Sequence, residues 1–144
     1  NQKEYMTKLL IAILVLLFMG IPFANAEQVY YCTSELATGI IKDEKTGKWK
    51  ESSFESQRLT IKFNDDYSKL DGMDDYSGTW KCQTSAESTT HQGILLCSAN
   101  LLTGFNFSFE TKTLRFLLSL TGVHGYVNNG DDTNVIIAGT CKKF

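Results

Sequence analysis

The chain has no excess of basic residues, and it lacks the common catalytic and metal-binding motifs. Its 14 Lys and Arg are outnumbered by 16 Asp and Glu, and a chain without a basic excess is not expected to bind nucleic acid. It has no Cys-x-x-Cys motif, and its two histidines lie far from the four cysteines in metal-ligand spacing. We therefore expect neither a metal site nor a cofactor. A Gly-x-Ser-x-Gly elbow is also missing, so a hydrolase would lack a recognised nucleophile.

The chain has one long apolar run, and it is too short to cross a membrane as a helix. It extends from Leu9 to Ile21, which is 13 residues, whereas a spanning helix needs about 20. A short segment that begins at Met6 and carries the positive charge of Lys8 precedes this run, and Ala24-Asn25-Ala26 with its small alanines follows it. This is the order of parts in a secretory signal peptide. We predict that residues 1–5 are translated upstream sequence, that residues 6–26 are the signal peptide, and that residues 27–144 form a single β domain.

Cleavage after Ala26 would release the domain, free of the membrane, into the bacterial periplasm or the medium. An exported chain with an even number of cysteines is expected to form disulfides. The four cysteines allow three pairings. The sequence favours Cys82–Cys97, which flank one polar loop, together with Cys32–Cys141, which would tie the two ends of the domain together.

After residue 26 no stretch keeps a helical period for three turns, whereas β-type segments recur. Arg58–Phe63 alternates cleanly, with Leu59, Ile61 and Phe63 on one face, which predicts an antiparallel strand with one buried side. A hairpin is expected across residues 38–50, closed by Gly47. We expect residues 64–75, which include five Asp, to form a loop and the Asn129-Gly130 pair to mark a tight turn. Further strands are predicted at residues 28–33, 78–82, 93–98, 104–110, 114–120, 122–127 and 134–141.

These segments predict an all-β fold, a small antiparallel meander of eight or nine strands. A closed barrel is preferred over a sandwich, because most connections are short and the first and last strands each carry a cysteine. The sandwich remains the alternative.

Two groups of residues are candidates for binding. One is an aromatic row that would line an apolar ligand cavity if the barrel is hollow, or form the core if it is filled: Phe105, Phe107, Phe109 and Phe116. The other group is a candidate interface of aromatic and acidic residues: Trp49, Trp80, Asp71 and Asp74. Tyr30 and Tyr31 are also candidates for an exposed aromatic face. The acidic loop could bind calcium or meet a basic partner, although the EF-hand order is absent.

The segments Tyr30-Tyr31-Cys32, Lys45-Thr46-Gly47-Lys48-Trp49 and Gly139-Thr140-Cys141 resemble those of small exported bacterial β-proteins of unknown function. Tyr30-Tyr31-Cys32, Cys141 and Tyr76-Ser77-Gly78 are also similar to parts of the periplasmic C-type lysozyme inhibitors, which are small β-barrels. This chain is longer than those inhibitors and has an extra cysteine pair, so no functional residue is transferred from them.

The sequence thus predicts an exported, non-enzymatic domain that binds a protein or a small apolar ligand. A secreted hydrolase that uses His91 or His124 is one alternative, and a structural envelope protein is another. A ligand carrier would show an open cavity lined by the phenylalanine row. A protein binder would show a filled barrel and an exposed aromatic or acidic patch.

Overall fold

The structure is a computed structural model of the 144-residue chain, and it describes residues 27–73, 80–84, 93–99, 104–122 and 124–144. The predicted signal peptide lies outside the described residues. The described part contains nine strands and a short 3₁₀ turn, η2. No helix in these ranges is long and apolar enough to cross a membrane. The elements are β1 (Gln28–Lys42), β2 (Trp49–Ser53), β3 (Arg58–Phe63), β4 (Lys69–Asp71), β5 (Trp80–Thr84), β6 (Ile94–Ser98), β7 (Phe105–Glu110), β8 (Arg115–Leu120), η2 (Tyr126–Asn128) and β9 (Asn134–Lys143).

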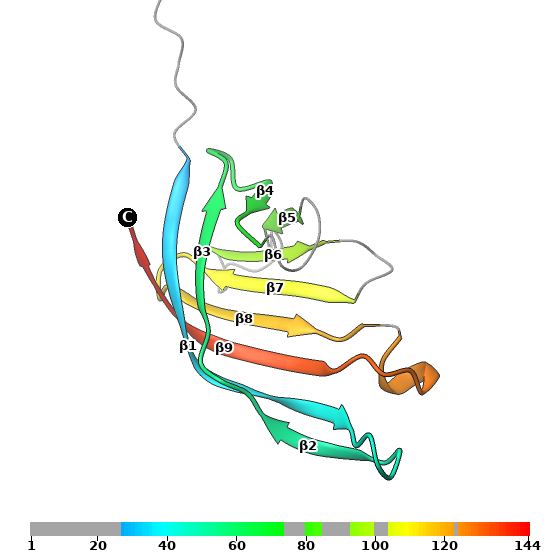
Figure 1. Ribbon diagram of the computed structural model, residues 1–144. Helices are drawn as coiled ribbons and strands as arrows, with labels where there is room; N and C mark the ends of the chain where they lie inside the picture. Colours follow the sequence, from blue (N-terminus) through cyan, green and yellow to red (C-terminus); the bar gives the residue numbers. More distant parts are fainter. Residues whose placement is uncertain (1–26, 74–79, 85–92, 100–103, 123) are drawn as a thin grey trace, which may run out of the picture.

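The strands form an antiparallel meander that closes on itself. Their order is β2-β1-β3-β4-β5-β6-β7-β8-β9, and β9 also pairs with β1. Eight strands therefore complete a barrel, and β2 lies outside the ring as an extra strand beside β1 (Figure 1). The predicted all-β meander and the preference for a closed barrel are confirmed.

β1 is the longest strand, with 15 residues, and it takes part in three pairings. Its first half pairs with β3 and its second half with β2, while β9 runs along its other edge. The register on β9 shifts between Ser34 and Leu36, where β1 changes direction. At this point the Ser34 hydroxyl accepts a hydrogen bond of 2.7 Å from the Gln57 N–H. The two strands predicted at residues 28–33 and 38–42 are therefore one bent strand.

Side chains fill the barrel in layers that follow the strand register. One layer crosses five neighbouring strands and is buried throughout, in the order Ala37, Ile137, Leu118, Phe107 and Cys97. In the next layer, Gly139 of β9 lies beside Phe116 of β8. A Cβ on Gly139 would come within 2.1 Å of the Thr33 carbonyl oxygen and 2.9 Å of the Phe116 ring. Only glycine fits there, because backbone and ring both press against that position.

Both disulfides form in the pairing that the sequence favoured. Cys32–Cys141 joins β1 to β9 where the barrel closes, across 109 residues of sequence, and Cys82–Cys97 joins β5 to β6 across 15 residues. All four cysteines are buried. Two disulfides indicate an oxidising environment outside the cytoplasm.

Two local predictions were wrong. The acidic segment after β3 contains a short strand, β4, because Leu70 turns into the core and is fully buried. Of the strand predicted at residues 122–127, the described residues 122 and 124–127 do not form a strand. There the chain turns at Gly125 and enters η2, and the Asn129-Gly130 pair, with Asn129 in the left-handed conformation, lies in a turn as predicted.

Removing either disulfide should destabilise the barrel, and the Cys32–Cys141 bond should matter more. In the chain-entropy model a cross-link around 15 residues stabilises by about 3 kcal/mol and one around roughly 100 residues by about 4.7 kcal/mol. We expect C32A/C141A to lower the free energy of unfolding more than C82A/C97A, as measured by urea denaturation. An equal or reversed order would mean that β1 and β9 stay together without their cross-link.

Phe109 tests whether the barrel interior is packed. Its ring is 1% exposed and packs on Tyr30, Phe63 and Phe107, with centroids 4.9, 5.6 and 6.3 Å away. Truncating a buried Phe to Ala typically costs about 3–5 kcal/mol, and we expect that loss for Phe109→Ala in urea denaturation. Leu117→Ala on the outer face is the control, and its smaller effect should stay near 1 kcal/mol or below. Similar losses for the two variants would contradict a packed interior.

Candidate binding site at the open end of the barrel

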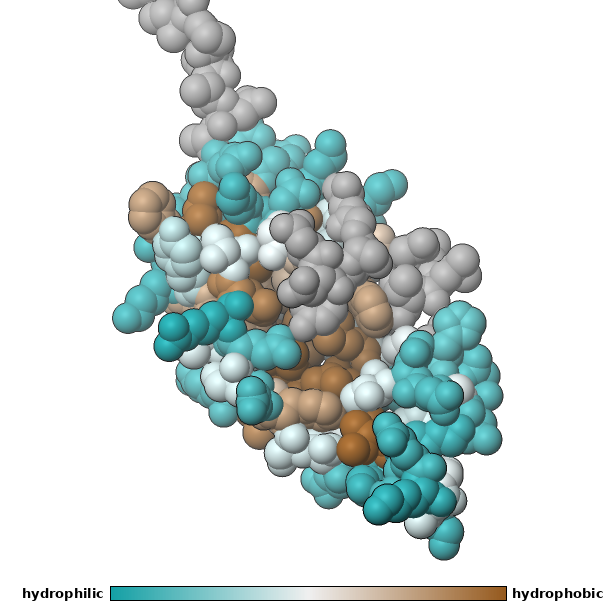
Figure 2. Space-filling model, in the orientation of Figure 1, coloured by the Kyte–Doolittle hydropathy of each residue, from teal (hydrophilic) through white to brown (hydrophobic). Residues whose placement is uncertain are grey.

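The barrel interior becomes accessible toward the end at which the β1–β2 hairpin projects. The layer next to the buried one consists of Gly39, Val135, Leu120 and Phe105 in register across four strands. Val135 and Phe105 are only half-buried there, and both pack against the core cluster. Figure 2 shows an apolar surface over the middle of the molecule, bordered by hydrophilic residues. At the hairpin end the half-buried Val135 directly follows the polar segment 131–134, so apolar and polar side chains lie next to each other there.

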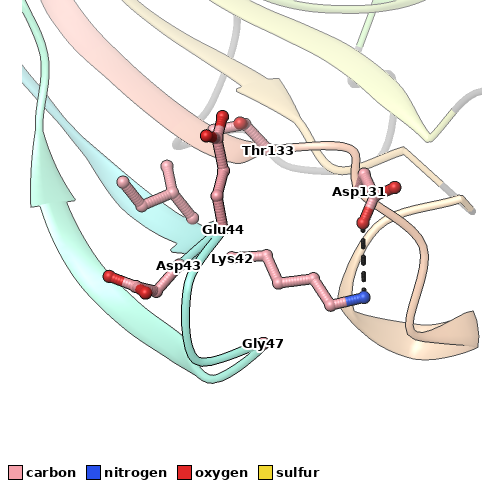
Figure 3. Close-up of a pocket in the computed structure, with 7 residues that line it drawn as sticks. Lys42, Asp43, Glu44, Gly47, Asp131 and Thr133 are labelled. Atoms are coloured by element: carbon pink, nitrogen blue, oxygen red, sulfur yellow. Dashed lines mark hydrogen bonds and ion pairs between the residues drawn. The ribbon is translucent and has the colours of Figure 1, made fainter.

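A cleft of about 690 Å³ lies at this end, between the β1–β2 hairpin and the loop that leads into β9 (Figure 3). The hairpin contributes most of its lining and the loop contributes the opposite wall. Carboxylates predominate over cations among the lining residues, which are Ile41, Lys42, Asp43, Glu44, Gly47, Asp131 and Thr133. The cleft is thus mainly acidic, with one aliphatic side chain at the end of β1.

Lys42 and Trp49 hold the two walls together. The Lys42 ammonium donates to the Asn129 carbonyl oxygen at 2.9 Å and lies 3.3 Å from the Asp131 carboxylate. The Trp49 indole N–H donates to the Asn129 side-chain oxygen at 3.4 Å, and its ring packs edge-on against Tyr126 with centroids 5.4 Å apart. Because Asp131 is 94% exposed, its ion pair adds little. The backbone contacts and the ring packing do more to position the loop.

The hairpin turn is built around Asp43. Its carboxylate accepts hydrogen bonds from the Thr46 N–H and hydroxyl, at 2.9 and 3.0 Å, and from the Lys50 ammonium at 2.8 Å. Gly47 has a φ of +64°, the left-handed conformation predicted for the residue that closes this hairpin. The Lys50 hydrogen bond, with those from Thr46, holds the pKa of Asp43 well below its usual 3.8. Asp43 is therefore a structural anion at the mouth of the cleft.

Glu44 is the carboxylate of the cleft that remains available. It is exposed and makes no hydrogen bond or ion pair with the described residues, whereas Asp43 and Asp131 are both engaged. Its side chain points toward Thr133 across the cleft (Figure 3). A lysine or arginine can lay its aliphatic stem on an apolar side chain and place its charge against a carboxylate. Ile41 and Glu44 offer that combination to a ligand.

The phenylalanine row divides between core and rim. Phe107, Phe109 and Phe116 are at most 4% exposed, and their rings stack on one another with centroids 5.7 and 6.3 Å apart. These contacts occupy the space that an apolar ligand would need. Phe105 alone reaches the open end of the barrel, as a half-buried residue.

The predicted interface residues do not come together. Trp49 lies at the cleft, whereas Asp71 is exposed at the end of β4, near the opposite end of the molecule (Figure 1). Asp74 lies outside the described residues. Trp80 is fully buried, and its indole N–H has no acceptor among the described residues. The prediction that Trp80 lies on an exposed face is therefore wrong. Side chains alternate along β5, and Trp80 is on the face that points into the barrel. Tyr30 is buried for the same reason.

The histidine and calcium hypotheses gain no support from the described geometry. His124 is exposed and its Nδ1 lies 3.3 Å from the Asn128 amide, with no carboxylate partner among the described residues. His91 lies outside them. In the acidic loop, Asp66 accepts hydrogen bonds from the Asn64 amide and the Ser68 N–H, which shape the turn before β4. These two hydrogen bonds are internal to the turn.

The residues that line the cleft were not predicted as a site from the sequence. The hairpin at Asp43–Gly47 and the loop at 129–130 were each recognised as turns, but Lys42 and Asn129 are 87 positions apart in the chain. Their proximity depends on the β1–β9 pairing. The charges of these turns were visible in the sequence, and only closure of the barrel places them face to face.

A second surface feature lies on the outside of the barrel. An uncharged row crosses five strands in register, in the order Leu36, Ala138, Leu117, Ser108 and Leu96. Its three leucines are about half-exposed, and Ile136 lies next to the row with similar exposure. The row lacks the charged groups that the cleft offers for orienting a partner.

The anionic role of Asp43 predicts a defined pH dependence. Because folding lowers its pKa, Asp43 contributes stability above pH 3.8, and that contribution is lost as pH falls from there toward the lower folded-state pKa. We expect the thermal midpoint of the wild type to fall more between pH 5 and pH 2 than that of Asp43→Asn. Lys50→Met, which removes the main cause of the shift, should reduce the pH dependence in the same direction. An unchanged slope for Asp43→Asn would contradict this assignment.

Comparison of the chain with protein-family models, with curated proteins and with solved structures found no match.

Proposed function

We propose that this chain is an exported, non-enzymatic domain that binds another protein through the open end of its barrel. The observation that carries this proposal is the contrast between a filled interior and a chemically mixed rim. Stacked aromatic rings occupy the centre of the barrel, whereas carboxylates, an aliphatic side chain, the exposed Tyr126 and the half-buried Trp49 lie around the cleft. Export through the predicted signal peptide agrees with the oxidising environment that the two disulfides indicate.

The rim has the composition expected of a protein interface. Tyr126 is 59% exposed and Val127 is 90% exposed on the η2 turn, and Tyr126 packs against Trp49 of the hairpin. Trp and Tyr are enriched among residues that dominate binding energy, because they bury a large area and still offer a polar atom. This aromatic pair lies beside the cleft, since the same hairpin and loop form both.

The charge of the cleft suggests a partner with a basic surface. Among its lining carboxylates, Asp43 is paired with Lys50 and Asp131 with Lys42, which leaves Glu44 as the carboxylate without an ion pair among the described residues. Complementary charge mainly raises the association rate and fixes orientation, whereas buried aromatic contacts supply most of the affinity. We therefore expect binding that weakens with salt but depends most on Trp49 and Tyr126.

Site-specific photo-crosslinking in the cells that make the protein tests this proposal. A photoreactive phenylalanine analogue at Tyr126 or Thr133 should give one discrete crosslinked protein product, because both positions border the cleft. The same analogue at Lys62, on the outer face of β3, is the control and should give none. Trp49→Ala should reduce the Tyr126 product severalfold while leaving the thermal midpoint within a few degrees, since Trp49 is only half-buried.

The control positions also identify the outcomes that would contradict the proposal. Equal products from Lys62 and Tyr126 would mean non-specific proximity. A product from the same analogue placed at Leu117, with none from Tyr126 or Thr133, would assign binding to the outer aliphatic row instead of the cleft. A small molecule released from the native protein on denaturation, detected by mass spectrometry, would favour the ligand-carrier alternative.

A further inference from the structure

β2 is a strand with one unpaired edge. In the sheet order it stands first, and its only neighbour among the described residues is β1. The eight barrel strands each have two neighbours in the closed ring. Figure 1 shows β2 outside that ring, at the foot of the molecule beside the second half of β1. A strand in this position presents backbone donors and acceptors that another chain can pair with.

The register shows which residues present those groups. The Asp43 N–H donates to the Lys48 carbonyl at 2.8 Å, and the Phe54 N–H donates to the Ala37 carbonyl at 2.9 Å. In an antiparallel pair the hydrogen-bonded positions alternate, so Lys50 and Ser52 also bond toward β1. The intervening residues Trp49, Glu51 and Ser53 direct their N–H and C=O groups away from β1.

The side chains at these three positions define what can approach. Trp49, Glu51 and Ser53 lie on one face of β2, because strand side chains alternate. Lys50, on the other face, is held by Asp43 at 2.8 Å. Glu51 is exposed and forms no ion pair with the described residues. The free edge therefore carries one uncompensated negative charge next to an aromatic ring.

We propose that β2 accepts an extended segment of the partner protein as an added strand, with a basic side chain opposite Glu51 and an apolar one against Trp49. This inference rests on the proposed protein-binding function and specifies its geometry. Backbone hydrogen bonds along a free edge supply affinity in strand addition, and alternate side chains supply specificity. Opposite charges in cross-strand positions stabilise such a pair.

Charge argues against a second copy of the chain as the added strand. Two β2 strands that pair antiparallel through all of their outward-facing groups place Glu51 opposite Glu51 of the other copy. Like charges in directly opposite positions are destabilising. The shortness of β2, five residues, also limits indiscriminate pairing. A basic segment from a different protein avoids that repulsion.

The Glu51→Pro substitution distinguishes strand addition from other modes of binding. The Glu51 N–H points away from β1, and proline is tolerated on an edge strand where the missing N–H faces solvent. Glu51→Pro should thus keep the circular dichroism spectrum and a thermal midpoint within several degrees of the wild type. Glu51→Ala is the matched control, because it removes the charge but keeps the N–H.

Random linear 12-residue peptides displayed on phage and selected on the folded, disulfide-bonded protein provide the probe. Selected peptides should be rich in Lys or Arg between β-branched residues. Chemically synthesised copies should bind Glu51→Pro at least about tenfold more weakly than the wild type. Proline removes a backbone hydrogen bond, and the peptide cannot then pair along the edge of β2. Glu51→Ala should bind only a few-fold more weakly. Bound peptide should also slow amide exchange at Glu51 but not at Ser52, whose N–H already bonds to β1.

The outcomes distinguish this inference from the proposed function beneath it. Peptides that bind Glu51→Pro as tightly as the wild type, but lose affinity for Glu44→Ala or Tyr126→Ala, would overturn strand addition and leave protein binding at the cleft intact. Selection of no peptide, together with a Tyr126 crosslink that persists in Glu51→Pro, would also overturn it. Loss of the Tyr126 crosslink in Glu51→Pro, with the fold retained, would support it in cells.

Discussion

The pairing of β1 with β9 is the interaction on which the rest of the structure depends. It brings the first and last strands of the domain together over most of their length, and the Cys32–Cys141 disulfide fixes that contact. Without it the meander would be an open sheet with two long edges and an exposed apolar face. Forming the β1–β9 pairing costs conformational entropy, because two distant parts of the chain must meet before the contact forms. A disulfide at this point lowers that cost by restricting the unfolded chain.

The same strand also builds the candidate site. β1 bends at Ser34–Leu36, stays paired with β9 as far as Ile40 and pairs with β2 on its other edge, so the hairpin projects beside the loop that precedes β9. Lys42 and Trp49 then attach hairpin to loop through Asn129. The cleft, the aromatic pair and the free edge of β2 are therefore three features of one projection. Their position relative to each other is set by barrel closure and not by local turn chemistry.

The interior and the rim perform separate tasks. Tightly packed aromatic rings stabilise the centre of the barrel, and each fully buried Phe contributes roughly 1.5–3 kcal/mol through burial alone. At the open end the layer that contains Val135 and Phe105 is only half-buried. A domain built in this way has a packed core and still presents apolar surface with polar orienting groups. That combination is what protein interfaces use at their centres and rims.

The sequence by itself determined the fold class, most of the strands and the disulfide pairing that it favoured. Those properties depend on period-two patterns such as Arg58–Phe63, on turn residues such as Gly47, and on cysteine spacing, all of which are local or countable. Tertiary structure decided which aromatics are buried, as at Trp80 and Tyr30, because a strand's facing side depends on which neighbours cover it. It also decided the site. Lys42 and Asn129 come into contact because the sheet closes. They are 87 positions apart, and a local sequence pattern does not predict a contact over that separation.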